Sequence, residues 1–108
     1  GGENISTIEV EQVIEQHPAI LECAVVAIPD EQWGERPMAF VTLRPEQTAT
    51  QEEIIAFCRT RLAHFKCPVA VEFRSLPKTS TGKIQKYKLR EELRARSAHL
   101  PGVAAVTG

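Results

Sequence analysis

The strongest constraint on the fold comes from two helix-start signals, which lie 44 residues apart at Ser6 and Thr50. Ser6 and Thr50 are each followed three residues later by Glu, which is the capping-box pattern that begins a helix. Apolar residues then recur at helical spacing after both signals. We predict a first helix that stops at His17-Pro18, because the residue before a proline disfavours helical geometry, and a second helix from about Gln51 to Ala63.

Three runs rich in β-forming residues predict three short strands, at Cys23 to Ile28, Met38 to Leu43 and Val69 to Phe73. Pro29-Asp30 opens a turn signal, so the first two strands should be joined by a loop of roughly nine residues. A third helix is expected from about Lys86 to Ala98. The order α-β-β-α-β-α predicts an α+β fold, with a small three-stranded sheet and flanking helices.

The 108 residues suffice for one domain, and we expect it to span residues 1–98, with residues 99–108 as a frayed tail. The chain begins Gly1-Gly2-Glu3 without an initiator Met, which suggests a piece excised from a longer protein. No apolar run reaches the roughly 18 to 20 residues of a membrane helix, and no secretory signal is present. We therefore expect a soluble cytoplasmic protein with no membrane span.

The net charge of −1 conceals a strong asymmetry along the chain. Residues 1–58 carry two bases and 11 acids (2 − 11 = −9), whereas residues 59–108 carry 11 bases and three acids (11 − 3 = +8). Such a split suggests that one face meets an anionic partner, although solvated helix faces also produce milder splits. Nucleic acid is not that partner, since the basic helix from Lys86 to Arg96 lacks interleaved aromatics beyond Tyr87.

The cysteines and histidines do not predict a metal site. Cys23, Cys58 and Cys67 are odd in number and lack C-x-x-C spacing, which argues against both a disulfide framework and zinc. We expect two packed thiols and one thiol in a loop. The three histidines also lack metal-ligand spacing, and solvated or capping roles are expected for His17, His64 and His99.

The most informative segment is the loop from Leu76 to Ile84, which reads L-P-K-T-S-T-G-K-I. Its rigid proline, three hydroxyl groups, glycine and lysine suit the presentation of an ammonium group and backbone donors to phosphate or carboxylate oxygens. A phosphate-binding P-loop requires G-x-x-x-x-G-K-[ST]. Pro77 replaces its first glycine and Ile84 replaces its hydroxyl residue, so the P-loop interpretation fails.

The pattern P-K-T-x-T-G-K-I followed by a basic helix resembles the C-terminal signature of adenylate-forming enzymes. The start, G-G-E-N-I-S-x-x-E-V-E, is similar to the segment that opens the C-terminal domain of those enzymes. The segments E-Q-W-G-E-R-P and F-K-x-P follow in the expected order, so the resemblance covers Gly1 to about Arg96. Within the superfamily the chain looks most like an acyl-CoA synthetase, and the resemblance implies the mobile C-terminal lid of an ATP-dependent carboxylic acid–CoA ligase.

The resemblance implies that Lys83 is the catalytic residue, with Thr81 and Gly82 on the ATP side of the same loop. An in-line attack of a carboxylate on the α-phosphate builds negative charge, which a positioned cation stabilises. The sequence around Lys83 also resembles sites modified by lysine acetyltransferases in this family. Such a modification would remove the charge of Lys83.

The resemblance further implies a site for coenzyme A. Gly1, Gly2 and Glu3 would line the pantetheine tunnel in the thioester-forming state, while an ordinary loop before a helix is the alternative. The nucleotide end of coenzyme A would be contacted by a second set of residues, namely Trp33, Phe65 and Lys66. In this chain Cys67 and Val69 stand where some relatives carry further basic residues.

The implied ligands are ATP, an acyl carboxylate and coenzyme A. The Mg²⁺ that accompanies ATP would be bound mainly by an absent domain. The implied partner is the enzyme's own large N-terminal domain. Alone, the lid should be inactive. A fatty or aromatic acid is the expected substrate, and fatty acid metabolism the expected context. Two alternatives stay open: the lid of a peptide-synthetase adenylation domain, and a stand-alone, non-catalytic binding module of the same fold.

Overall fold

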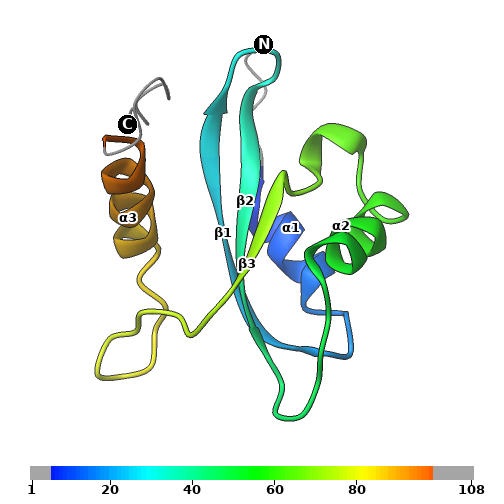
Figure 1. Ribbon diagram of the computed structural model, residues 1–108, viewed down its shortest axis with the longest axis vertical. Helices are drawn as coiled ribbons and strands as arrows, with labels where there is room; N and C mark the ends of the chain where they lie inside the picture. Colours follow the sequence, from blue (N-terminus) through cyan, green and yellow to red (C-terminus); the bar gives the residue numbers. More distant parts are fainter. Residues whose placement is uncertain (1–5, 99–108) are drawn as a thin grey trace.

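The computed structural model describes residues 6–98 and contains the predicted order of helices and strands (Figure 1). A single 3₁₀ turn, η1, was not predicted from the sequence. The elements are α1 (Thr7–Ile14), β1 (Ile20–Asp30), β2 (Gly34–Leu43), α2 (Gln51–Arg59), η1 (His64–Lys66), β3 (Ala70–Phe73) and α3 (Lys86–Ala98). Gly1, Gly2, Glu3 and the predicted tail lie outside the described residues.

The three strands form one sheet in the order β1-β2-β3. β1 and β2 are antiparallel, whereas β2 and β3 are parallel, with α2 and η1 in the crossover between them. Figure 1 shows α1 and α2 on one face of the sheet and α3 on the other. The α+β prediction, a three-stranded sheet with flanking helices, is confirmed.

Successive residues of β1 and β2 point to opposite faces of the sheet, and each face is covered. On β1, Cys23 and Val25 belong to the core under α1 and α2, whereas Ala24 and Val26 belong to the core under α3. This double covering explains why the strands read as continuous apolar runs rather than as alternating ones. Besides Ala24 and Val26, the buried members of the core under α3 are Met38, Phe40, Leu76 and Leu89.

Both predicted helix starts are confirmed. The Ser6 hydroxyl accepts a hydrogen bond from the Glu9 N–H at 3.2 Å, and the Thr50 hydroxyl accepts one from the Glu53 N–H at 3.1 Å. The Glu9 carboxylate does not complete a capping box, because it forms an ion pair with Lys66 instead.

Two helices end earlier than the sequence predicted. α1 ends at Ile14, before His17-Pro18, and α2 ends at Arg59 rather than at Ala63. In α2 the Phe57 carbonyl accepts hydrogen bonds from the Thr60 hydroxyl at 3.1 Å and from the Arg61 guanidinium at 2.9 Å. Side chains thus satisfy a carbonyl that a longer helix would have bonded internally.

The predicted nine-residue loop between the first two strands is wrong. β1 continues to Asp30 and β2 begins at Gly34, so the connection is only residues 31–33. One Asp30 carboxylate oxygen accepts the N–H groups of Gln32 and Trp33, both at 2.9 Å, and Gly34 has a φ of 82° that favours glycine. Pro29 lies on β1, which is an edge strand, and edge strands are where proline is tolerated in a sheet.

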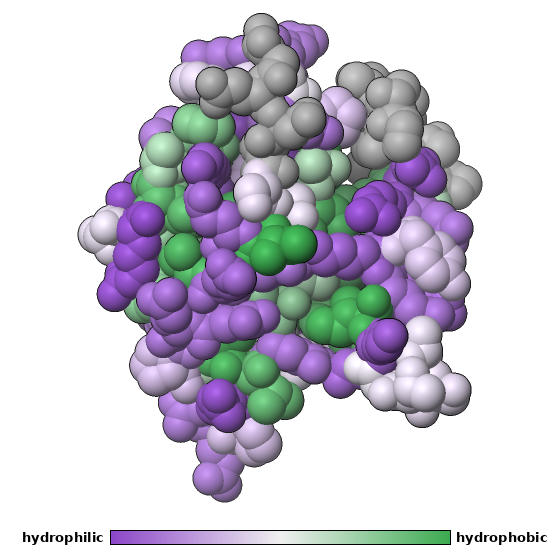
Figure 2. Space-filling view, turned by 180° about the vertical axis from the view of Figure 1, so that it is seen from behind, coloured by the Kyte–Doolittle hydropathy of each residue, from purple (hydrophilic) through white to green (hydrophobic). Residues whose placement is uncertain are grey.

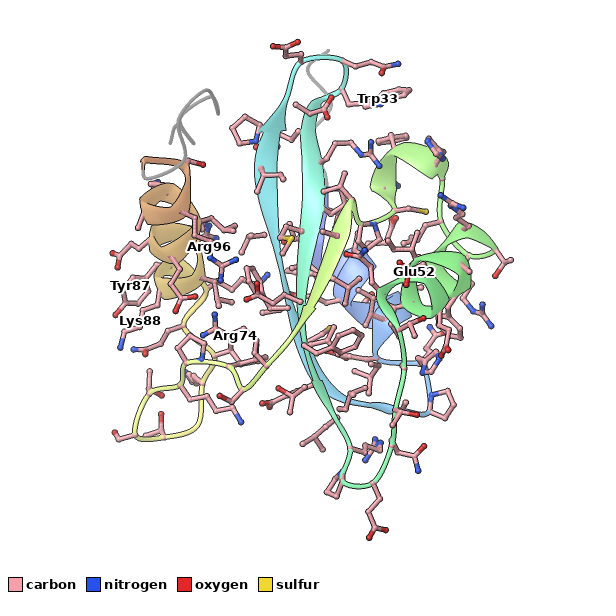
Figure 3. The ribbon with its side chains drawn as sticks, in the orientation of Figure 1. Trp33, Glu52, Arg74, Tyr87, Lys88 and Arg96 are labelled. Carbon is pink, nitrogen blue, oxygen red and sulfur yellow. The ribbon has the colours of Figure 1, made fainter. Side chains whose placement is uncertain are left out.

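α3 is attached to β3 by charged side chains. Arg74 bonds Glu92 and Glu72, and Arg96 donates to both oxygens of Glu72 at 2.8 and 3.0 Å. Figure 3 shows Arg74 and Arg96 between the sheet and α3. Hydrogen bonds from Arg96, with those from Arg74, hold the pKa of Glu72 below its usual value.

The face opposite to that of Figure 1 is mixed in character. Figure 2 shows hydrophobic areas broken up by hydrophilic side chains. The larger exposed hydrophobic side chains also come from separate elements: Ile8, Leu21, Trp33, Val69 and Tyr87. Within residues 6–98, no helix has the length and apolar character needed to cross a membrane.

Candidate functional site

The loop that carries Lys83 is closed by hydrogen bonds within itself. Lys78 and Ile84 face each other in an isolated antiparallel bridge, and the Gln85 N–H donates to the Pro77 carbonyl at 2.9 Å. Further along, the Thr79 N–H donates to the Lys83 carbonyl at 2.8 Å. The loop therefore has a short two-stranded stem, and Lys83 lies on it rather than at a free tip.

Thr79 organises the turn at the end of this stem. Its hydroxyl accepts the Lys83 N–H at 3.1 Å and lies 3.0 Å from the Thr81 hydroxyl, while its carbonyl accepts the Gly82 N–H at 2.9 Å. Gly82 has a φ of 88°, which L side chains rarely adopt, and no atom lies within 4 Å of an added Cβ. Backbone conformation, not space, requires glycine at this position.

Lys83 is exposed, and within the described residues its ammonium group forms no ion pair or side-chain hydrogen bond. Thr81 and Gly82 are exposed beside it. The loop thus fixes the backbone of Lys83 at both its N–H and its carbonyl, while leaving the cation available for an external anion.

A second group of predicted residues meets at the turn between β1 and β2. The rings of Trp33 and Phe65 lie 6.2 Å apart between centroids with an interplanar angle of 21°, so they are nearly parallel. The Lys66 ammonium lies 5.7 Å from the Phe65 ring centroid and 2.9 Å from a Glu9 oxygen. Trp33 is 37% exposed, so this pair offers an accessible aromatic surface next to a cation. Figure 3 shows the Trp33 side chain at the turn between β1 and β2.

The structure does not bring the two groups together. In Figure 1 the turn between β1 and β2 lies at one end of the sheet, and the Lys83 loop projects near the other end. Gly1, Gly2 and Glu3, the third predicted group, lie outside the described residues. Within residues 6–98 the domain therefore carries two separate candidate sites.

The sequence did not predict the ion pairs that join residues 1–58 to residues 59–108. The opposite charges of these two segments were the feature that could have indicated them. Part of this asymmetry is neutralised within the domain, so fewer bases than expected are left for an anionic partner. The pairs are Lys66 with Glu9 at 2.9 Å, Lys78 with Glu22 at 2.8 Å and Lys86 with Glu11 at 2.6 Å.

The three cysteines are free thiols, and all three are buried. The predicted loop thiol is Cys67, which follows η1, but it is as buried as the two thiols in the helix and the strand. Burial is the main cause that raises the pKa of Cys23 to about 12 and that of Cys58 to about 11, and it also raises the pKa of Cys67. These thiols stay protonated at neutral pH and are poor nucleophiles. No group of three metal-ligating side chains occurs among residues 6–98.

The chain matches the family of the AMP-binding enzyme C-terminal domain over residues 9–83, and it belongs to that family. The match ends at Lys83, so most of the candidate loop lies within the matched residues. The chain is 57% identical over 94 residues to a probable CoA ligase, CCL11, of Humulus lupulus, covering 84% of this chain and 17% of the relative.

Two solved structures are similar in both sequence and fold. A fatty acyl CoA synthetase of Mycobacterium tuberculosis has a TM-score of 0.77 and 41% identity, covering 89% of this chain and 19% of the other. An anthranilate CoA ligase, AuaEII, in complex with anthranoyl-AMP has a TM-score of 0.80 and 42% identity, covering 91% and 20%. The chain thus spans about a fifth of the length of these relatives.

Proposed function

We propose that this chain is the C-terminal lid of a longer ATP-dependent carboxylic acid–CoA ligase, with the domain at residues 1–98. In the first half-reaction a carboxylate oxygen attacks the α-phosphate of ATP, and pyrophosphate leaves. In the second, the coenzyme A thiol attacks the carbonyl carbon of the acyl-adenylate, and AMP leaves. The observation that carries the proposal is the exposed Lys83 ammonium on a loop closed at both sides of that residue.

Lys83 acts in the first half-reaction. Two anions approach each other there, so a fixed cation beside the α-phosphate stabilises the transition state more than the separated reactants. Thr81 and Gly82 lie beside the lysine and would contact the phosphates from the same loop. Mg²⁺ would reduce the charge of the phosphates, and we assign its ligands to the absent N-terminal domain.

We assign the nucleotide end of coenzyme A to Trp33, Phe65 and Lys66. The nearly parallel rings of Trp33 and Phe65 suit an adenine ring. The Lys66 ammonium pairs with Glu9 at 2.9 Å in the domain alone, and it would exchange that carboxylate for a phosphate of the ligand. Gly1, Gly2 and Glu3 would line the pantetheine tunnel. The separation of this group from the Lys83 loop supports a lid that presents one end to each half-reaction.

We expect replacement of Trp33 by alanine in the full-length enzyme to raise the KM for coenzyme A about tenfold, because stacking on a base contributes roughly 1 to 3 kcal/mol. The KM for ATP should not change. Steady-state kinetics with each substrate varied in turn measures both constants. Tyr87→Ala removes another exposed aromatic ring, on α3, and serves as the control. An unchanged KM for coenzyme A in Trp33→Ala would remove this residue from the site.

The relatives support a CoA ligase over the lid of a peptide synthetase, and over a stand-alone binding module. The two similar structures are those of a fatty acyl CoA synthetase and an anthranilate CoA ligase, and these names support a fatty or aromatic acid as substrate and a role in fatty acid metabolism. The three free thiols fit a reducing compartment, which supports a cytoplasmic location.

The test of the proposed function uses the full-length enzyme with and without these 108 residues. Acid-dependent exchange of pyrophosphate into ATP reports the first half-reaction, and thioester formation reports the second. Both should fall at least about 100-fold without the lid, which itself should be inactive. A parent gene without an upstream ATP-binding domain, or a truncated enzyme of full activity, would contradict the proposal.

A lysine acetyltransferase acting on Lys83 would regulate the same step. The exposed ammonium is accessible, and acetylation would remove its charge. Mass spectrometry of cell-derived enzyme across growth conditions should detect acetyl-Lys83 in some of them, and consistently unmodified Lys83 argues against this regulation.

A further inference from the structure

Both ends of the Lys83 loop are tied to the acidic half of the chain. Before the loop, Lys78 pairs with Glu22 of β1 at 2.8 Å. After it, Lys86 at the start of α3 pairs with Glu11 of α1 at 2.6 Å. The hydrogen bonds inside the loop hold its shape, but these two ion pairs connect it to the sheet and to α1.

The Glu11 carboxylate is the more strongly fixed of the two acceptors. Its side chain is only 15% exposed, and the oxygen that faces Lys86 also accepts the Val25 N–H of β1 at 2.8 Å. Lys86 in turn donates to the Thr7 hydroxyl at 3.3 Å. A carboxylate bonded to the backbone of an edge strand cannot move without breaking that bond, so it is a rigid anchor for the lysine.

Apolar packing alone leaves the direction of the loop less defined. Ile84 packs against the core under α3, and Leu76 is buried in that core before the loop begins. These contacts hold the loop close to the sheet, but apolar contacts are non-directional. The Glu11–Lys86 pair adds a directed contact only three residues after Lys83.

We propose that Glu11 is a positioning residue for Lys83: by holding Lys86 against α1, its carboxylate fixes the C-terminal stem of the loop and so the location of the Lys83 ammonium. This inference rests on the proposed role of Lys83 in acyl-adenylate formation. Small misplacements of a catalytic group are costly, with about 1 Å corresponding to a loss of up to about 100-fold in rate. Glu11 touches no substrate and acts only through Lys86.

The first experiment compares Glu11→Gln with the unmodified full-length enzyme. Glutamine keeps an oxygen that can accept the Val25 N–H but loses the charge that holds Lys86. We expect acyl-adenylate formation to slow about tenfold. Pyrophosphate exchange into ATP measures this rate. Thioester formation from supplied acyl-adenylate should stay within about twofold, because that step does not use Lys83. Glu15→Gln is the matched control, since Glu15 is an exposed acid near the end of the same helix.

Lys86 provides the test from the other side of the pair. Lys86→Gln leaves the Glu11–Val25 hydrogen bond in place and should slow the first half-reaction like Glu11→Gln, even if the latter folds poorly. Lys86→Arg keeps the charge and should retain most of the activity. An equal loss in both half-reactions for Glu11→Gln and Lys86→Gln would show a purely structural role and overturn the inference.

A double-mutant cycle shows whether Glu11 works through Lys83. If it does, Lys83→Ala combined with Glu11→Gln is no slower in the first half-reaction than Lys83→Ala alone. If the double variant is slower than Lys83→Ala by the same factor that Glu11→Gln alone causes, the inference is overturned. It is also overturned if Lys83→Ala slows the first half-reaction strongly while Glu11→Gln leaves its rate unchanged. An unchanged rate in Lys83→Ala overturns the proposed function itself, and the inference with it.

Discussion

Replacing Lys83 with alanine in the full-length enzyme should slow acyl-adenylate formation by about 10²- to 10³-fold. The loop should keep its shape, because its hydrogen bonds use the Lys83 N–H and carbonyl, which alanine retains. The loss is therefore that of the ammonium group alone. Thioester formation from supplied acyl-adenylate should be largely preserved, because we assign the coenzyme A contacts of that step to the other end of the domain.

Pyrophosphate exchange measures the first half-reaction, and supplied acyl-adenylate isolates the second. Lys88→Ala is the matched control, since Lys88 is an exposed lysine on α3 five residues further along (Figure 3). Its removal should leave both rates within about twofold. Equal losses of both half-reactions in Lys83→Ala would remove Lys83 from the role proposed for it.

The largest effect on stability is expected for Phe40→Ala. Phe40 is fully buried on β2, in the core under α3, and the Arg74 guanidinium lies 5.8 Å from its ring centroid. Truncating a buried phenylalanine costs about 3 to 5 kcal/mol, from lost burial and from the cavity left behind. A domain of this size has a total stability of about 5 to 15 kcal/mol, so much of it would be lost.

Urea denaturation of the 108-residue chain measures this change in unfolding free energy. Tyr87→Ala is the control, since Tyr87 is 51% exposed on α3 and its removal should change stability by less than about 0.5 kcal/mol. A loss below about 1 kcal/mol for Phe40→Ala would mean that α3 contributes little to a common core with the sheet.

The features that the sequence predicted correctly are local ones. The Ser6 and Thr50 caps involve atoms three residues apart, and each strand was recognised from its own β-forming run. The predicted length of the β1–β2 turn was wrong. The true length depends on cross-strand pairing, such as that of Pro29 with Glu35, which no local pattern shows. Composition around Pro29 favoured a loop, and the ladder overrode it.

For the candidate site, the sequence likewise predicted individual residues but not their arrangement. The loop motif identified Lys83, and the resemblance identified Trp33 and Phe65, but neither the ring pairing nor the distance between the two groups was predictable. Glu11 was noted only as the last residue of the G-G-E-N-I-S-x-x-E-V-E pattern. Its contact with Lys86 joins residues far apart in sequence, and charge counts show that acids and bases are present without showing which of them meet.

The ion pairs between the halves also set a limit on recombination between related enzymes. Glu9, Glu11 and Glu22 all precede α2, whereas their partners Lys66, Lys78 and Lys86 all follow it. A crossover point inside this domain would join acids from one parent to bases from another, with no guarantee that their positions correspond. Residues 9–86 are therefore best exchanged as one block, with crossover points placed outside it.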